Sequence, residues 1–271
     1  MKKSLFLILL PAFVLFISCE KDQAESSKSN EIPQSVVSKI KSLELNPEGL
    51  VSKQIQNPDG TIEDAYVVEG CIAIKKDDLL NMNIYDGISG EQYHTHNLVS
   101  TPSTITVLGY TKGKEALTTK MQAALTEAVA NYNNLNIGLT FTLTFGSDLT
   151  GIDICVYKLR GSAGGYAGFP SDGVPYPWVR IFSGTDAYSA DVNEHVITHE
   201  LGHCVGLRHT DWFSRESCGT ISPEDAEPTG AVHIPGTPTG YDANSLMRSC
   251  FTSSEDGEFG SYDEVALEYL Y

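Results

Sequence analysis

The side chains best placed to do chemistry together lie in one stretch, His199-Glu200-Leu201-Gly202-His203-Cys204-Val205-Gly206-Leu207-Arg208-His209. On a helix, His199 and His203 would stand four residues apart, so both imidazoles would project from one face and could bind one cation. Gly206 can adopt a positive φ, end the helix and turn the chain so that His209 supplies a third nitrogen. Three histidine nitrogens leave one position for water, which is typical of a catalytic zinc site rather than a structural one.

Glu200 follows the first histidine directly. A carboxylate at this place can accept a proton from a zinc-activated water and return it to the leaving group, and no covalent intermediate is needed. The shorter pattern HExxH occurs by chance on helices, but HExxHxxGxxH fixes five residues and favours a metal site. His195 lies one turn earlier on the same side of the helix. Because the ligand set is complete without it, we interpret His195 as a supporting or exposed side chain.

Hydrophobic periodicity predicts the elements that must position these groups. The pattern around the motif predicts a helix that begins near Asp191, preceded by the alternation of strands and helix that is typical of an α+β domain. The predicted strands are Ile105–Tyr110, Leu139–Phe145, Ile152–Val156 and Trp178–Phe182, and the other predicted helices are Lys114–Asn133 and one opened by a capping box at Ser261–Glu264. Ahead of them we expect a short helix over Pro33–Leu45, a turn at Asn57–Gly60 and a strand-forming run from Ala65 to Ile74.

The zinc motif resembles that of the metzincin clan of endopeptidases. The string from His199 to Asp211, with Ile234-Pro235-Gly236-Thr237-Pro238 and Asn244-Ser245-Leu246-Met247-Arg248, is similar to the dual-action HEIGH metallopeptidase family. The resemblance implies a metzincin-like catalytic domain with a twisted mixed sheet, an active-site helix, a turn that carries Met247 beneath the metal, and a C-terminal helix. It implies Zn²⁺ as the cofactor and proteins or peptides as substrates. The alternative for Met247 is a side chain that merely fills the core.

The same resemblance assigns Gly165-Tyr166-Ala167-Gly168-Phe169 to the edge strand above the cleft. There the main chain of Tyr166, Ala167 and Gly168 would hydrogen-bond an extended substrate. A glycine-rich turn is the alternative. Some metzincins carry a tyrosine two residues after the methionine, but Ser249 stands at that position, so we assign no such role.

The N-terminus predicts export. Lys2 and Lys3 precede an apolar run from Leu5 to Phe16, which suits a signal peptide but is too short to span a membrane as a helix. Ser18-Cys19 resembles the lipobox of bacterial lipoproteins, so Cys19 would be lipidated and the chain held at the cell envelope or cell surface; the alternative is ordinary cleavage near Ser18. The following polar stretch, Glu20 to Asn30, is typical of a flexible tether.

The charge of the chain limits its partners. The 271 residues carry 35 Asp and Glu against 18 Lys and Arg, a formal net charge of -17. Such a surface repels phosphate backbones, so we expect no nucleic acid as a partner.

Cys71 suggests a latent enzyme. Val68-Glu69-Gly70-Cys71-Ile72 resembles the F-x-G-D motif of astacin prosegments, in which the aspartate blocks the zinc, and a thiolate is an excellent fourth zinc ligand. The alternative is a buried or disulfide-bonded cysteine in a strand. We therefore divide the chain into a signal peptide (1–18), a lipid-anchored tether with a short helix (19–50), an inhibitory prosegment (51–101) and the catalytic domain (102–271).

Four further cysteines allow three pairings. We favour Cys218 with Cys250, because one follows the third histidine and the other follows the turn of Met247, so both would flank the cleft. Cys155 with Cys204 would then tie a strand to the active-site helix.

Two weaker sites and two other classes of protein complete the expectations. Asp211 could orient His209 through a hydrogen bond, and Asp256 and Glu258 could contact a calcium ion, although their spacing does not match a full loop of oxygen ligands. A lipid-anchored module that binds a host or matrix component could keep the zinc fold, but it would not need Glu200. A structural zinc protein would favour four protein ligands with closely spaced cysteines.

Overall fold

Residues 32–82, 93–219, 232–238 and 241–271 are described in a computed structural model of the chain. The predicted signal peptide, the lipidated Cys19 and the tether up to residue 31 lie outside these described residues and stay predictions. Within the described residues, no helix is both long enough and apolar enough to cross a membrane.

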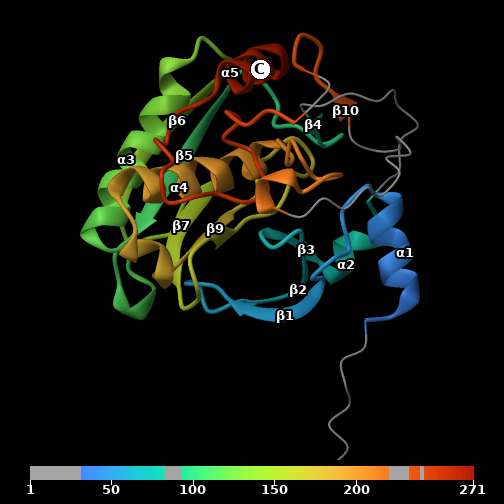
Figure 1. Ribbon diagram of the computed structural model, residues 1–271. Coiled ribbons are helices and arrows are strands. Elements are labelled where there is room, and N and C mark those ends of the chain that lie inside the picture. The colour runs from blue at the N-terminus through green and yellow to red at the C-terminus, as the bar shows by residue number, and fades with distance from the viewer. Residues whose placement is uncertain (1–31, 83–92, 220–231, 239–240) are drawn as a thin grey trace, which may run out of the picture. The chain divides into compact units, whose positions relative to one another are not determined.

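A five-stranded mixed sheet organises residues 103–182 (Figure 1), and its strand order is β6-β5-β7-β9-β8. The strands are β5 (Ser103–Tyr110), β6 (Leu139–Gly146), β7 (Ile154–Leu159), β8 (Gly165–Tyr166) and β9 (Trp178–Phe182). Strands β5, β6, β7 and β9 run parallel, whereas β8 pairs antiparallel with β9 at the edge. The four strands that sequence periodicity predicts are therefore present, with ends that shift by a few residues.

Helices α3 (Thr119–Asn134) and α4 (Ala190–Val205) cover one face of this sheet (Figure 1). Their apolar side chains share one core with strand residues that include Val107, Val156 and Ile181. Helix α3 begins five residues later than predicted, because Thr118 is its N-cap: the Thr118 hydroxyl accepts the N–H of Met121 at 3.2 Å. The residues before this cap form a separate 3₁₀ turn, η1 (Gly113–Glu115).

The N-terminal region folds as two short helices and a small antiparallel sheet. It comprises α1 (Gln34–Ser42), β1 (Val51–Gln56), β2 (Ile62–Val68), β3 (Ile72–Lys75) and α2 (Lys76–Leu79), and the sheet order is β1-β2-β3. The run from Ala65 to Ile74 is thus two strands rather than one. It breaks at Glu69 and Gly70, whose φ angles of 55° and 86° turn the chain.

Strands β1–β3 lie against the face of the five-stranded sheet that the helices leave uncovered. Ile55, Ala65, Val67 and Ala73 form a cluster with Tyr166, against which Leu159 and Phe182 pack. These contacts place the turn at Glu69–Gly70 beside helix α4.

The C-terminal part closes the fold with short elements. Strand β10 (Val232–His233) pairs with β4 (Tyr93–His94), η2 (Ser183–Ala187) and η3 (Glu216–Cys218) are 3₁₀ turns, and α5 (Ser261–Leu270) is the final helix. The capping box predicted at Ser261–Glu264 does not form. The N-cap is Gly260, which has no side chain, and only its N–H makes a capping contact, to Asp263 Oδ2 at 2.9 Å. Residues 32–271 form one compact unit, so the predicted boundary at 102 does not coincide with a gap in packing and stays a prediction.

Candidate metal centre

Helix α4 presents the histidines because both of its ends are fixed. At its start, the Ser189 hydroxyl accepts the N–H of Val192 at 3.2 Å. At its end, Gly206 has a φ of 110°, and the Leu207 N–H donates back to the Gly202 carbonyl at 2.9 Å. This left-handed residue turns the chain and brings His209 back to the helix, as the spacing of the motif predicts.

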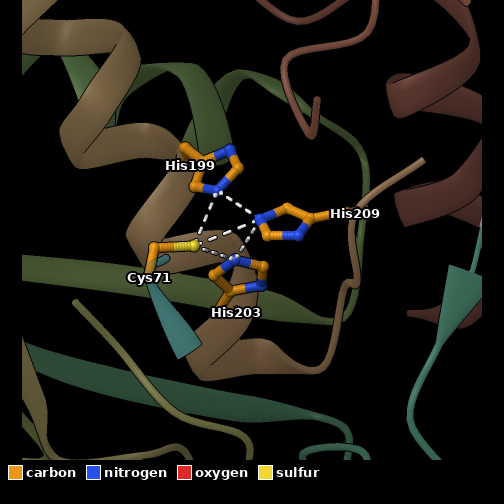
Figure 2. Close-up of side chains that lie close together, drawn as sticks. All are labelled: Cys71, His199, His203 and His209. Carbon is orange, nitrogen blue, oxygen red and sulfur yellow. Dashed lines mark hydrogen bonds between the residues drawn. The ribbon is translucent and has the colours of Figure 1, made fainter. Parts of the chain in front are cut away.

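Four side chains converge at one point (Figure 2). The Nε2 atoms of His199, His203 and His209 lie 3.7, 3.4 and 3.1 Å from Cys71 Sγ. His209 Nε2 also lies 3.2 Å from His199 Nε2 and 3.3 Å from His203 Nε2. Within the described part of the chain, this is the one group of three or more potential metal ligands, and its ligand atoms all lie within 4.8 Å of one another.

In His199 and His203, the hydrogen bond made by Nδ1 determines which nitrogen can bind a metal. His199 Nδ1 donates to the Leu246 carbonyl at 3.0 Å, and His203 Nδ1 donates to the Leu207 carbonyl at 2.8 Å. A carbonyl can only accept, so each Nδ1 carries the proton and each Nε2 presents a lone pair to the centre. Burial, together with the neighbouring histidines, lowers the pKa of both imidazoles well below the usual value, which favours the neutral form that ligates metals.

Cys71 and the three imidazoles form a donor set that fits zinc. Burial, followed by the charges of Glu200 and Glu69, raises the pKa of the Cys71 thiol well above its usual value. A cation at the centre would oppose this shift, because the thiolate is the form that binds a metal. One sulfur and three nitrogens that converge on a buried point are typical ligands of tetrahedral zinc.

Glu200 lies beside this cluster on the wall of a cleft of about 250 Å³ that Cys71 and His199 also line. The side chain is 1% exposed, and Glu200 Oε2 has no hydrogen-bond partner among the described groups. Burial raises the pKa of Glu200 well above its usual value, although the charge of Arg180 opposes the shift. Gly165 makes room for the carboxylate, since a Cβ on this residue would lie 2.8 Å from Glu200 Oε1.

The edge of the five-stranded sheet is occupied by the N-terminal region. The Ala167 N–H donates to the Cys71 carbonyl at 2.9 Å, and the Ala73 N–H donates to the Ala167 carbonyl at 2.6 Å. Of the three residues predicted to form this edge, Tyr166 lies in β8, Ala167 makes the bridge, and Gly168 lies beyond the strand. Gly168 also packs against the same segment, because a Cβ there would lie 2.7 Å from the Ala73 carbonyl oxygen.

The turn of Met247 lies directly under helix α4. A Cβ on Gly202 would lie 2.7 Å from Met247 Sδ, so the glycine lets the turn approach the helix between the first two histidines. Asp263, which is fully buried, holds this turn: its carboxylate accepts from Ser245 Oγ at 2.7 Å and from the Leu246 N–H at 2.7 Å. From the sequence, Asp263 is recognisable only as part of a helix cap, because its contacts with residues 245 and 246 span 17–18 positions.

Two cysteine pairings were predicted, and one of them forms. The structure contains a disulfide between Cys218 and Cys250. The predicted pairing of Cys155 with Cys204 is wrong, because both are free thiols. Cys204 lies in the core beneath the helices, whereas Cys155 lies in a separate cluster with Tyr157. Along β7, Ile154 and Val156 face the helix core, so the side chain of Cys155 points to the opposite face of the sheet.

Contrary to the expectation from the sequence, Asp211 does not orient His209. Its carboxylate instead accepts from Ser217 Oγ at 2.5 Å and from the Ser249 N–H at 2.8 Å, and so ties together the two loops that the disulfide joins. The partner of His209 is Glu69, whose Oε2 lies 2.6 Å from His209 Nδ1. Glu69 stands two residues before Cys71, and this neighbourhood was the only sequence signal that could have identified it.

A buried ion pair also joins the N-terminal region to the sheet, and no sequence pattern predicts it. Arg180 on β9 has no exposed surface, and its guanidinium donates to Glu63 Oε2 at 2.9 Å. Tyr157 and Asn57 accept further N–H groups of Arg180, each at 2.9 Å. No local pattern reveals this pair, because Glu63 and Arg180 lie 117 residues apart.

His195 and the acidic pair near the C-terminus lie outside the metal cluster. His195 is buried and lies 3.9 Å from Glu255, and burial lowers its pKa to about 4. It lines the cleft but is not one of the converging ligands. Asp256 accepts the N–H of Glu258 at 3.2 Å, and neither side chain belongs to a group of three potential ligands among the described residues.

Comparison with known proteins agrees with the motif. A family model described as dual-action HEIGH metallo-peptidase matches residues 66–271. No curated protein matches the sequence. Two solved structures titled "Crystal structure of myroilysin" and "Structure of myroilysin" are similar, each at 16% identity, with TM-scores of 0.42 and 0.43. They cover 64% and 66% of this chain, and 86% and 98% of their own chains.

Proposed function

Because the chain belongs to the dual-action HEIGH metallo-peptidase family, we propose that it is a zinc-dependent endopeptidase that is made in a latent form. The observation that carries the proposal is the convergence of three imidazole Nε2 atoms next to a buried Glu200 carboxylate oxygen that has no hydrogen-bond partner among the described residues. His199, His203 and His209 would hold the metal, and Glu200 would act as the catalytic residue. When bound, zinc would acidify a water molecule and polarise the scissile carbonyl.

The residues of the chain divide the remaining work. Glu200 takes the proton of the attacking water and delivers it to the leaving amine. The Ala167 N–H and carbonyl hold an extended substrate by main-chain hydrogen bonds, as they now hold Cys71 and Ala73. Met247 and its turn fix His199 from below through the Leu246 carbonyl.

A comparison of Glu200→Gln with Glu194→Gln tests the catalytic role. Both glutamates are buried on α4, but only Glu200 lines the cleft. We expect Glu200→Gln to lower kcat/KM by roughly 10² to 10⁴ on a peptide library while the zinc content stays the same, and Glu194→Gln to keep its activity. Zinc-loaded protein that cleaves no peptide in either intact or trimmed form would refute the endopeptidase and favour a binding module.

Latency is supported by two contacts of one segment. The turn after β2 brings Cys71 Sγ to the metal ligands, and the next residues occupy the sheet edge that a substrate needs. We propose that residues 51–101 form an inhibitory prosegment and that Cys71 blocks the position of the attacking water until this region is removed. Thiolate and water compete for the same fourth position of a three-histidine zinc site.

Cys71→Ala and Cys204→Ala separate the metal block from general effects of losing a buried thiol. In the intact chain, Cys71→Ala should increase binding of a small zinc-binding hydroxamate by roughly tenfold or more, because a ligand position opens. Peptide cleavage should increase less than after trimming, since Ala73 still occupies the sheet edge. Cys204→Ala should change neither readout, and an unchanged Cys71→Ala protein would exclude the thiol block.

We further propose that the enzyme is exported and anchored through Cys19. The support is the sequence alone: a basic start, an apolar run and Ser18-Cys19 at its end. Labelling of the wild-type protein with a fatty-acid analogue, and loss of the label in Cys19→Ser, would test the anchor. Equal labelling of both proteins would rule out lipidation at Cys19.

A further inference from the structure

The three histidines of the metal cluster differ in what supports them. His199 and His203 donate from Nδ1 to backbone carbonyls of Leu246 and Leu207, and both carbonyls belong to the part of the chain that carries the histidines. His209 has a different partner: its Nδ1 lies 2.6 Å from a carboxylate oxygen of Glu69, in the N-terminal region. One histidine therefore depends on a distant segment, and on a charged group.

The turn after β2 holds Glu69 in this position. Glu69 is 1% exposed and adopts a left-handed φ of 55°, which is uncommon for a residue with a side chain. Its other carboxylate oxygen accepts the Asn46 N–H at 2.8 Å, and Arg208 lies 3.9 Å away. With Gly70 also left-handed, the turn directs the side chains of Glu69 and Cys71 to the same cluster from one short segment.

A carboxylate on the outer N–H of a ligating histidine has two effects. It fixes the orientation of the ring, and it makes the ring a stronger donor to the metal, so that losing such a partner typically weakens metal binding by about 10- to 100-fold. A neutral carbonyl orients a ring but adds less negative charge to it. Among the three histidines, His209 is therefore the one whose hold on the metal would change most when its partner changes.

We propose that Glu69 is a positioning residue for His209, and that through it the intact protein holds zinc more tightly than the protein from which the N-terminal region has been removed. This inference rests on the proposed latent zinc enzyme and deepens it. The segment that blocks the metal with Cys71 also strengthens one of the metal ligands through Glu69. Removal of the segment then opens a coordination position and weakens the remaining site in the same event.

Glu69→Gln in the full chain is the central test. The amide keeps the shape of the side chain and can still accept the His209 N–H, but it carries no charge. The rate at which zinc passes to a chromogenic chelator should rise by about 10- to 100-fold over the wild type. Glu44→Gln is the control, because it removes the charge of another buried carboxylate of the N-terminal region.

Replacing zinc by cobalt distinguishes two causes of faster metal release in Glu69→Gln: loss of the support for His209, and loosening of the turn that carries Cys71. The charge-transfer band between thiolate and Co²⁺ reports that Cys71 is still bound to the metal. Faster metal release with this band retained supports the proposal. Unchanged release in Glu69→Gln overturns it, and so does faster release with the band lost, because Glu69 would then act by holding the turn.

A measurement on the unsubstituted chain does not depend on how the variant folds. In the zinc-loaded protein, the Nδ1 proton of His209 should resonate further downfield than those of His199 and His203, since it alone is shared with a carboxylate. Three equivalent resonances would overturn the inference. Wild-type protein that binds no zinc at these histidines would instead refute the proposed function itself.

Discussion

Two regions supply groups to the metal cluster, and they are held in different ways. His199 and His203 of helix α4 are kept in place by the neutral carbonyls of Leu246 and Leu207. The N-terminal region is held by buried charged groups, chiefly Glu69 in the turn after β2, beside His209, and Glu63 in β2, beside Arg180. Arg208 adds a further link, because it donates to the carbonyl oxygens of Leu43 and Glu44.

The difference indicates what it costs the N-terminal region to detach from the metal cluster. A neutral hydrogen bond within one region survives when another region departs, whereas a buried charge that loses its partner strongly destabilises what remains. The carbonyl contacts of His199 and His203 therefore persist when the N-terminal region leaves. Its departure is nevertheless costly, because it leaves Arg180 without its counter-charge. Cooperative attachment suits a latent state, because partial opening is disfavoured.

Breaking the pair of Glu63 and Arg180 should have the largest effect. Glu63→Gln leaves a fully buried guanidinium without a counter-charge, so the free energy of unfolding should fall by about 3–5 kcal/mol. The double variant Glu63→Leu/Arg180→Met should recover most of this loss, because it removes both charges. Chemical denaturation of the full chain measures both values.

The neighbouring pair of Asp64 and Lys76 is a matched control. Its side chains are 50% and 31% exposed and lie 2.8 Å apart. Asp64→Asn should therefore change the free energy of unfolding by no more than about 1 kcal/mol. Equal losses for Glu63→Gln and Asp64→Asn would show that burial of charge does not hold the N-terminal region.

The buried charge of Asp263 tests how far the region that carries the histidines is stabilised by its own contacts. Asp263→Asn keeps the shape of the side chain but weakens its charge-assisted hydrogen bonds to Ser245 and Leu246, so the free energy of unfolding should fall by about 2–3 kcal/mol. Glu264→Gln, at the next and exposed position of α5, should have an effect below about 0.5 kcal/mol. Thermal unfolding of the two variants side by side gives the comparison, and a similar loss in both would contradict it.

Loss of the Glu194 carboxylate should raise the free energy of unfolding, whereas loss of the Glu63 carboxylate should lower it. Burial raises its pKa to about 7, even though Asn131 donates a hydrogen bond to it. The folded protein thus binds this proton more tightly than the unfolded chain, whose carboxyl has a pKa near 4.5, so the free energy of unfolding declines as pH rises from about 4.5 through 7. Glu194→Gln removes this decline and should stabilise the protein at pH 8 by about 1–2 kcal/mol, which allows for screening by solvent.

Unfolding of the wild type and of Glu194→Gln at pH 5 and pH 8 checks this sign. The variant should gain stability only at the higher pH. A constant difference at both values would mean that the carboxyl of Glu194 does not titrate in this range. With Glu63→Gln, the pair of results would show that loss of a buried carboxylate destabilises where a cation faces it and stabilises where none does.

Local patterns in the sequence predicted the parts of the molecule that local physics determines. The sequence predicted the strand Trp178–Phe182 to the residue, and the spacing of His199, His203 and His209 predicted the convergence that the structure shows. A helix brings residues four apart to one face wherever it lies, so such a pattern needs no tertiary information. The turn back to His209 was equally local, because Gly206 alone supplies it.

Contacts between distant segments were harder to predict. Asp211 was a reasonable partner for His209 by proximity in the chain, yet Glu69 takes that place from 140 residues away. The pairing of Cys155 failed because the side chain faces away from the helices, and the side of a sheet that a strand residue faces is decided by the register of the whole sheet. Long-range charge pairs leave no periodic trace in the sequence.

The bridge at Ala167 has a consequence for solubility. Both main-chain hydrogen-bonding groups of Ala167 are engaged by Cys71 and Ala73, so this end of the five-stranded sheet offers no free edge there. An open strand edge can pair with any other chain, including a second copy of the same protein, and leads to aggregation. We therefore expect coverage of this edge by the N-terminal region to limit self-association. Protein that lacks this region should aggregate at lower concentration than the full chain.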